Sequence, residues 1–202
     1  MTPPPYLPER LTGRVVHLEP LAERHWPGIL AAGLHPELWT WTIETIVDEG
    51  GLRAYFDRAL SAAAAGRAVP FATVDAGSGV VVGSTRFGNL DAVNRHVEIG
   101  WTWVTPARQR SAVNTEAKYL MLRHAFESWR CHRVELKTDA LNARSRAAML
   151  RIGAREEGVF RSYQVRQDGR VRDTAWYAIT AADWPEVKAG LERRLWQPPT
   201  AR

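Results

Sequence analysis

The part of the chain that most constrains its fold is a strand-like run followed by a short polar loop and a long amphipathic helix. In residues 96–104 apolar and polar side chains alternate, which is the period of a β-strand. Pro106 should end this strand, and residues 107–112 form a polar loop. Residues 114–129 then carry apolar side chains on two faces of a helix, so we expect this helix to be well buried. A buried strand joined to a buried helix predicts a sheet that is covered by helices.

Periodicity and turn signals predict the remaining elements. Further strands are expected at residues 15–18, 69–75, 80–87, 132–138, 157–166 and 170–179. Further helices are expected at residues 22–33, 52–65 and 143–152, with a last one that starts near Thr180. Residues 35–45 have little periodicity and are interpreted as a loop or a broken helix. This order predicts a single α/β (α+β) domain over residues 1–202, with a core of about 11–185, short terminal extensions, and a mixed sheet with helices on both faces.

The composition is that of an ordinary globular protein. The 202 residues are 45% hydrophobic and 24% charged, and at this length roughly 70% of the unfolded surface can be buried without a disulfide or a metal. Cys131 is the one cysteine, so neither an internal disulfide nor a paired-cysteine metal site can form. No signal peptide is visible near the start, and no stretch approaches the ~18 apolar residues of a membrane span. We therefore expect a cytoplasmic protein without a membrane partner.

The formal net charge of +5 raises the question of a nucleic-acid partner. The arginines are spread along the chain among acidic residues, and no run of five or six basic residues occurs. Because a basic patch is the informative signal, we do not expect nucleic acid to be the main ligand. A few of these arginines are enough to line a cleft for a small polyanion.

The loop before the helix at 114–129 has the features of a phosphate site. A strand that runs through a loop into a helix N-terminus presents unpaired backbone N–H groups at the positive end of the helix dipole. This arrangement suits a phosphate or a pyrophosphate. Gln109, Arg110 and Ser111 add side-chain donors. On its own the pattern is weak, because most strand–loop–helix turns bind nothing.

Four segments carry a family resemblance. They are Val97-Glu-Ile-Gly-Trp-Thr-Trp-Val-Thr-Pro106, Gln109-Arg-Ser-Ala-Val-Asn-Thr-Glu-Ala117, Leu141-Asn-Ala-Arg-Ser145 and Ile152-Gly-Ala154. Together they resemble the acetyl-CoA-binding motifs of the GNAT N-acetyltransferase superfamily. The hairpin at residues 168–173, followed by Tyr177, is similar to the RimJ/RimL-like branch, which acetylates ribosomal-protein N-termini. The resemblance extends from about Leu11 to Pro185.

The resemblance implies the acyl-CoA N-acyltransferase fold, with a mixed and mostly antiparallel sheet, and acetyl-CoA as the cofactor. The residues that it assigns to the cofactor are Trp101, Trp103, Val104, Gln109, Arg110, Ser111, Ala112, Val113, Asn114, Thr115, Asn142 and Ser145. Ala112 and Asn114 depart from the family's loop, which has glycine at the first position and glycine or alanine at the second. Alanine is tolerated there if its φ is negative, and asparagine can accept a left-handed φ or cap the helix.

Glu98 is the candidate general base for an amine acceptor. It lies on the strand before the loop, on the face opposite Val97, Ile99 and Trp101. The resemblance places a carboxylate at this position in several GNAT enzymes, facing the acceptor. The alternative is a solvent-facing glutamate that is paired with a neighbour such as Arg95.

The start of the helix at 143–152 offers candidates for the leaving-group side. Ser145 resembles the serine that protonates the thiolate in the ribosomal-protein branch, and its alternative role is a helix cap. Asn142 resembles the residue that binds the pantetheine arm, and it can be the N-cap at the same time. For the oxyanion, the resemblance implies backbone N–H groups near Trp101 to Val104.

The acceptor is expected to be a primary amine, on a protein N-terminus or on a small molecule. Trp39, Trp41, Tyr163 and Asp173 are the candidates to frame its site, and packing is the alternative role of the aromatic ones. The histidines show no metal-ligand spacing, so no metal is expected. A homodimer is left open. Two other function classes compete: a non-catalytic CoA-binding or regulatory module, and a basic protein associated with RNA or the ribosome.

Overall fold

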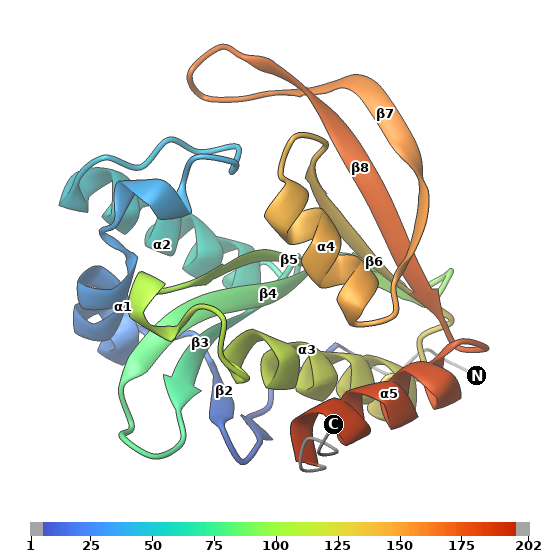
Figure 1. Ribbon diagram of the computed structural model, residues 1–202. Coiled ribbons are helices and arrows are strands. Elements are labelled where there is room, and N and C mark those ends of the chain that lie inside the picture. The colour runs from blue at the N-terminus through green and yellow to red at the C-terminus, as the bar shows by residue number, and fades with distance from the viewer. Residues whose placement is uncertain (1–5, 197–202) are drawn as a thin grey trace, which may run out of the picture.

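The computed structural model describes residues 6–196, which form an eight-stranded sheet with helices on both faces (Figure 1). In chain order the strands are β1 (Leu11–Thr12), β2 (Val16–Pro20), β3 (Val69–Asp75), β4 (Val81–Asp91), β5 (His96–Val104), β6 (Arg133–Asp139), β7 (Arg155–Val165) and β8 (Val171–Thr180). Their order across the sheet is β1-β2-β3-β4-β5-β6-β8-β7. All neighbours are antiparallel except β5 and β6, which are parallel. The mixed, mostly antiparallel sheet is thus confirmed, and most of the expected terminal extensions lies outside the described residues.

Five helices cover the sheet. They are α1 (Trp26–Gly33), α2 (Glu49–Ala64), α3 (Val113–Arg123), α4 (Ala143–Arg151) and α5 (Trp184–Trp196). Short 3-10 turns lie at Glu23–His25, Pro36–Leu38 and Pro106–Arg108, and a π turn at His124–Ser128 continues α3. Helices α3, α4 and α5 pack on one face, in a core cluster that includes Leu120, Ile152 and Leu191. Helices α1 and α2 pack on the other face in a second cluster, around Leu52 and Trp103.

The expected elements are all present, and the structure differs from the prediction mainly at their ends. Strand β1 was not predicted, because a strand of two residues carries no periodicity. Helix α2 begins at Glu49 rather than near residue 52, because the Asp48 carboxylate caps its first turn. The last helix begins at Trp184 rather than near Thr180. Residues 181–183 form a turn, in which the Asp183 carboxylate accepts hydrogen bonds from the Thr180 N–H and hydroxyl.

A buried carboxylate joins α3 to the first strands. Glu116 is fully buried, and its two oxygens accept hydrogen bonds from the backbone N–H groups of Arg14, Val15 and Val16 at 2.9, 2.6 and 2.7 Å. Three charge-assisted hydrogen bonds offset the cost of burying the charge. The contact fixes α3, and with it the loop before α3, relative to the edge of the sheet.

A β-bulge in β5 changes which face its last residues occupy. Trp101 has a left-handed φ of 50°, and neither Trp101 nor Thr102 has a register partner on β4. Before the bulge, Ile99 lies in the cluster with α3, whereas Trp103 after it lies in the cluster with α1 and α2. The prediction that one alternation runs through the whole strand is therefore wrong after Gly100, because the extra residue shifts the side-chain alternation by one position.

Candidate active site

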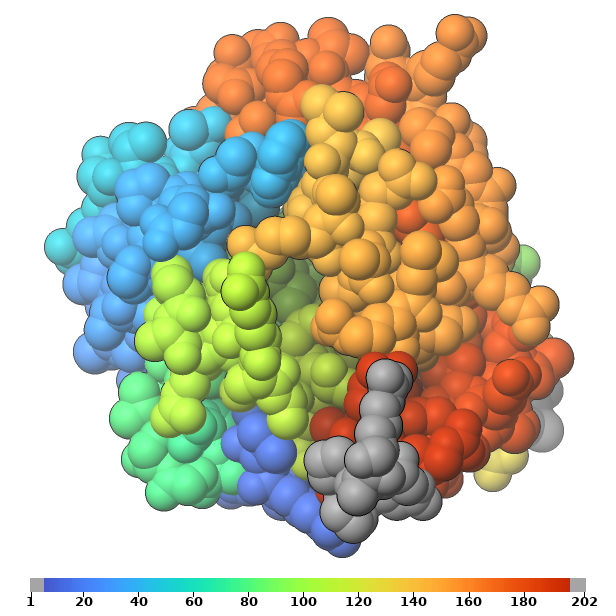
Figure 2. Space-filling model, viewed as in Figure 1, coloured from blue at the N-terminus to red at the C-terminus, as the bar shows by residue number. Residues whose placement is uncertain are grey.

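The two parallel strands in the middle of the sheet separate after a short ladder. They pair over three positions, the last of which is Glu98 opposite Glu135. Beyond it, β5 continues to Val104 and β6 to Asp139 without a shared register. Figure 2 shows a hollow near the centre of this face of the molecule, between the lime segment after β5, the yellow-orange start of α4 and the blue segment between α1 and α2. Most of the expected site residues lie on these elements.

The loop after β5 leaves several backbone N–H groups free. Within residues 6–196, the N–H groups of residues 110–115 donate to no backbone or side-chain acceptor, except that of Val113. They stand at the N-terminus of α3, where the helix dipole favours an anion. The Gln109 amide and the Ser111 hydroxyl instead donate to backbone carbonyls of the same segment, at 2.9 and 2.6 Å. These two side chains therefore shape the loop, and the anion donors are chiefly backbone groups.

The two substituted loop positions do not require glycine. Ala112 has a φ of −71°, and Asn114 lies in the first turn of α3, so neither residue has left-handed backbone. Asn114 thus takes neither of the roles expected for it, a left-handed φ or a helix cap. Its Oδ1 is buried and has no hydrogen-bond partner in the described part of the chain. The loop residue with positive φ is Arg110, at 58°, and its side chain is exposed. The backbone of the loop therefore does not need glycine at position 112 or 114.

The start of α4 lies across the opening from this loop. Asn142 is the N-cap of α4, because its Oδ1 accepts a hydrogen bond from the Ser145 N–H at 3.0 Å. The Arg144 guanidinium donates to Gln109 Oε1 at 2.6 Å and so links α4 to the loop. The Ser145 side chain is half-buried in the first turn. The cap role of Asn142 is confirmed, and the proton-donor role of Ser145 stays a prediction.

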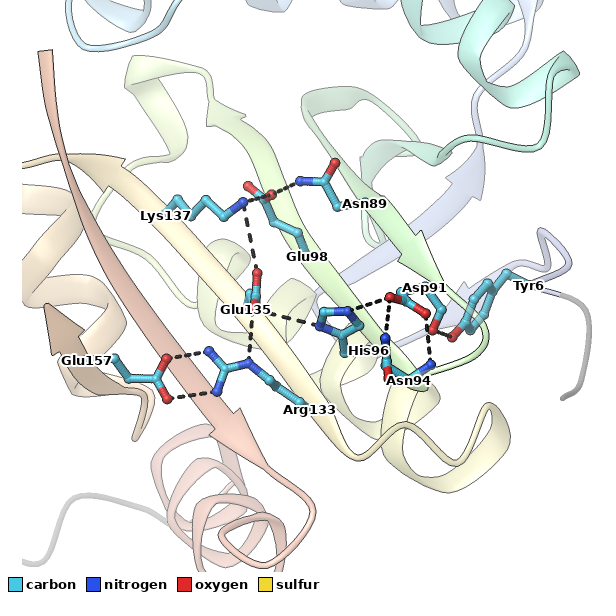
Figure 3. Close-up of polar contacts among 10 residues, drawn as sticks. All are labelled: Tyr6, Asn89, Asp91, Asn94, His96, Glu98, Arg133, Glu135, Lys137 and Glu157. Atoms are coloured by element: carbon cyan, nitrogen blue, oxygen red, sulfur yellow. Dashed lines mark hydrogen bonds and ion pairs between the residues drawn. The ribbon is translucent and has the colours of Figure 1, made fainter. Parts of the chain in front are cut away.

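Glu98 is a buried carboxylate at the point where β5 and β6 separate (Figure 3). Its Oε2 accepts hydrogen bonds from Asn89 Nδ2 at 2.5 Å and from Lys137 Nζ at 2.8 Å. Its Oε1 has no partner among the described residues and lies beside Gly100, where an added Cβ would come within 3.0 Å of it. The alternative of a solvent-facing glutamate paired with Arg95 is wrong, because Glu98 is buried and paired with Lys137, while Arg95 contacts a histidine just before β6.

Charged side chains continue from Lys137 along the same face of β6 (Figure 3). Lys137 Nζ also lies 3.9 Å from Glu135 Oε2 and 3.8 Å from the centre of the Trp176 ring. Glu135 in turn accepts a hydrogen bond from Arg133 Nε at 3.0 Å. The Lys137 ammonium thus lies between two carboxylates, and its charge offsets their mutual repulsion.

Trp39, a candidate for the acceptor site, lies in the interior. Only 3% of it is exposed, and its Nε1 donates to the Gly33 carbonyl at 2.9 Å. Its ring packs against those of Tyr55 and Trp103, with centroids 5.1 and 5.8 Å apart. This placement favours the packing interpretation for Trp39.

The other three candidates are nearer the surface. Trp41 and Tyr163 are 37% and 44% exposed. Tyr163 forms an aromatic cluster with Phe160 and Trp176, with ring centroids 5.7 and 5.3 Å away. Asp173 uses Oδ1 to accept a hydrogen bond from a backbone N–H of β7 at 2.7 Å. Tyr163 therefore contacts Trp176, whose ring also contacts the ammonium of Lys137. Asp173 instead bonds the backbone of the hairpin.

Among residues 6–196, no group of three or more His, Cys, Asp or Glu side chains is arranged to hold a metal ion. Cys131 is buried, and burial raises its pKa to about 11, so little thiolate exists at neutral pH.

None of the helices in the described range is long and apolar enough to cross a membrane.

Comparison with known proteins identifies the family. The acetyltransferase (GNAT) domain family matches residues 16–155, which is more than half of the chain. The chain belongs to the GNAT acetyltransferase family. It is therefore of the class of acetyl-CoA-dependent N-acetyltransferases, and its sheet and helices have the GNAT fold.

Three proteins are similar to this chain, and two of them indicate its branch of the GNAT family. A GCN5-related N-acetyltransferase from Brucella melitensis has a TM-score of 0.88 at 31% identity, over 98% of this chain and 90% of that chain. Mycobacterium smegmatis RimJ, solved in complex with CoA-disulfide, has a TM-score of 0.74 at 30% identity, over 92% and 91%. YdaF of Bacillus subtilis (strain 168), provisionally named a ribosomal N-acetyltransferase, is 32% identical over 110 residues. That match spans 54% of this chain and 59% of YdaF. The RimJ/RimL-like resemblance is confirmed.

The sequence analysis missed the two partners that hold the carboxylate of this GNAT protein. Lys137 could have been predicted, because alternation around the apolar Val134 and Leu136 places it on the polar face of β6. Asn89 carried no signal. It lies beyond the predicted end of its strand and has a left-handed φ of 46°, so no periodicity indicates where its side chain points.

Proposed function

We propose that this chain transfers an acetyl group from acetyl-CoA to the N-terminal amine of a protein, in a complex that holds both substrates at once. The observation that carries the proposal is Glu98, which is held through Oε2 by two donors and has its Oε1 free where β5 and β6 separate. The provisional name of YdaF supports a protein N-terminus as the acceptor. A small-molecule amine is the alternative acceptor.

The residues that would hold acetyl-CoA lie on both sides of the opening. The free N–H groups of residues 110–115 and the exposed Arg110 would bind the pyrophosphate. Asn142, at the start of α4, would bind the pantetheine arm from the other side. When bound, acetyl-CoA supplies an acetyl group that is activated as a thioester.

Glu98 Oε1 would take the proton from the acceptor amine, directly or through one water. An α-amine, with a pKa of ~8, needs less help to lose its proton than a lysine amine at ~10.4. Asn89 and Lys137 hold Oε2, so the carboxylate cannot turn freely and Oε1 keeps its position. This restraint keeps the proton acceptor where the amine arrives.

Two further groups would act on the acyl side. Backbone N–H groups of the β5 bulge, at Trp101 and Thr102, would stabilise the negative charge that develops on the acyl oxygen, and one such donor contributes ~3 kcal/mol. The Ser145 hydroxyl, half-buried at the start of α4, would donate a proton to the leaving sulfur.

The substitution Glu98→Gln tests the proposal, because glutamine keeps the size of the side chain but cannot take the proton. We expect kcat for an N-terminal peptide to fall by ~10²-fold or more, with the Kd for acetyl-CoA changed by less than about threefold. Glu135→Gln is the matched control, because this neighbouring carboxylate is also partly buried and ion-paired. It should keep most of the activity.

An unchanged kcat in Glu98→Gln would remove Glu98 from the mechanism. Binding of acyl-CoA without transfer to any amine in a broad panel would instead indicate a non-catalytic CoA-binding module. Steeply salt-dependent affinity for RNA, without amine acetylation, would favour the RNA-associated alternative.

A further inference from the structure

Three arginines on the β7–β8 hairpin have different charge partners. Arg166 pairs with Asp168, with 3.3 Å between Nη1 and Oδ2. Arg170 pairs with Asp139. Arg172 has no carboxylate within 4 Å among the described residues. Of these three arginines near the turn of the hairpin, two are therefore ion-paired, and Arg172 has no carboxylate within ion-pair distance.

Arg172 is nevertheless buried, with 6% of it exposed. Its Nη1 donates to the Trp41 carbonyl at 3.2 Å and its Nε to Thr174 Oγ1 at 3.3 Å, and both acceptors are neutral. Its Nη2 donates to no other described residue. Burial lowers the pKa of Arg172, but an arginine does not lose its proton in a protein. A buried charge of this kind is costly unless an anion pairs with it.

Two other buried cations show how the protein offsets this cost elsewhere. Arg86 is 7% exposed, and its guanidinium lies over the rings of Tyr55 and Trp101, 5.1 and 4.9 Å from their centres. Lys118 is 6% exposed, and burial lowers its pKa to about 7, so it can release its proton. In the described range Arg172 has neither an aromatic ring beneath it nor a carboxylate within 4 Å.

Arg172 lies on the same face of the sheet as the proposed base. Trp176 is opposite Lys137 in the β6–β8 ladder, and Lys137 is ion-paired with Glu98. Arg172 and Thr174 precede Trp176 at intervals of two residues, so alternation places them on this face. Burial lowers the pKa of Arg172 most, while the charge of Asp139 and, more weakly, that of Glu98 oppose this shift from beyond 4 Å. The Trp41 carbonyl that Arg172 binds belongs to the blue segment beside the hollow of Figure 2.

We propose that Arg172 binds a carboxylate that the acceptor carries within one or two residues of its amine. The proposal rests on the proposed function, since the amine would then lie at Glu98 Oε1. An extended chain advances about 3.3–3.6 Å per residue, so a carboxylate at the first or second position of a peptide remains close to the amine. The acceptor class is therefore a protein N-terminus that begins with Asp or Glu, or has one of them as its second residue.

The test uses pairs of hexapeptide amides that differ only in Asp or Asn at the first or second position. We expect the wild-type protein to acetylate at least one Asp peptide with a kcat/KM about tenfold or more above that of its Asn partner, because a hydrogen bond to a charged group is strong. Arg172→Gln should remove this preference mainly through KM, and leave the Asn peptide within about threefold of wild type. Arg172→Lys should retain part of the preference.

Arg166→Gln is the matched control. Arg166 also donates to a carbonyl of the segment between α1 and α2, at 2.9 Å, but its charge is already paired with Asp168. The Arg166→Gln protein should keep the preference for the Asp peptide over the Asn peptide even if its kcat falls. Equal losses for both peptides in Arg172→Gln would show a structural cross-link and overturn the inference, as would a wild-type protein without any preference. If the wild-type protein acetylates neither kind of peptide, the proposed N-terminal acceptor fails and this inference fails with it.

Discussion

At the scale of single residues, Lys118 connects α3 to the bulge in β5. Its Nζ donates to Thr102 Oγ1 at 2.5 Å and to Thr85 Oγ1 at 3.4 Å, and no carboxylate in the described range lies within 4 Å. Burial lowers its pKa from 10.5 to about 7. Between these two values the unfolded chain binds more protons than the folded one. Lys118 therefore lowers the free energy of unfolding, and this loss grows as the pH falls from about 10.5 to about 7. Below about 7 the loss stays constant.

The substitution Lys118→Met tests this cost, because methionine has a similar shape and no charge. We expect the free energy of unfolding of the wild type, relative to Lys118→Met, to rise with pH between 7 and 10, by at most about 1.4 kcal/mol per pH unit. Urea unfolding of both proteins at a series of pH values measures the difference. A difference that stays constant over this range would mean that Lys118 keeps its proton in the fold.

At the scale of elements, the left-handed backbone in the loop before α3 lies at Arg110 and not at either of the two substituted positions. Ala112 has a φ of −71°, whereas Arg110 has a φ of 58°. Glycine is therefore favoured at position 110 and has no conformational advantage at position 112.

The substitution Ala112→Gly should lower the free energy of unfolding by up to about 1 kcal/mol, because glycine gives the unfolded chain more freedom. It should not tighten acetyl-CoA binding, measured by calorimetry. Arg110→Gly is the matched control, since it relieves a left-handed residue and should stabilise the fold while it removes a cation from the loop. Clearly tighter binding by Ala112→Gly would show that the alanine does obstruct the cofactor.

At the scale of the whole molecule, the shortest strand pairing in the interior of the sheet lies at the opening. Strands β5 and β6 share three register pairs, while every other pair of neighbours except β1 and β2 shares at least five. Across this opening the loop and α4 are joined by the bond between Arg144 and Gln109. A ligand that contacts both the loop and α4 would link the two halves of the sheet.

Acetyl-CoA and free CoA should therefore stabilise the entire chain against heat. At 100 times Kd, binding adds ~2.7 kcal/mol, which for a chain of this length raises Tm by roughly 5–10 °C. ATP is the control, because it carries phosphates on an adenosine but no pantetheine. Thermal unfolding without any shift from CoA species would contradict the cofactor site, and an equal shift with ATP would indicate a general phosphate site.

Local pattern in the sequence was enough to predict the order of the elements, the position of the loop before α3 and the place of Glu98 on β5. Periodicity and turn residues act over a few neighbouring positions, so they can be read without knowing what a segment packs against. The condition set for Ala112, a negative φ, is also met, because it depends on the backbone of that residue alone.

Only the tertiary structure decided what surrounds Glu98. Its partners Asn89 and Lys137 lie on two other strands, and the registers that bring them together depend on bulges and on a parallel pairing that no local pattern specifies. The same is true of Arg172, whose unpaired charge could not be told from the paired charges of its neighbours in the sequence. The chemistry of a buried side chain depends on groups that are distant in the chain, and packing alone determines which of them meet.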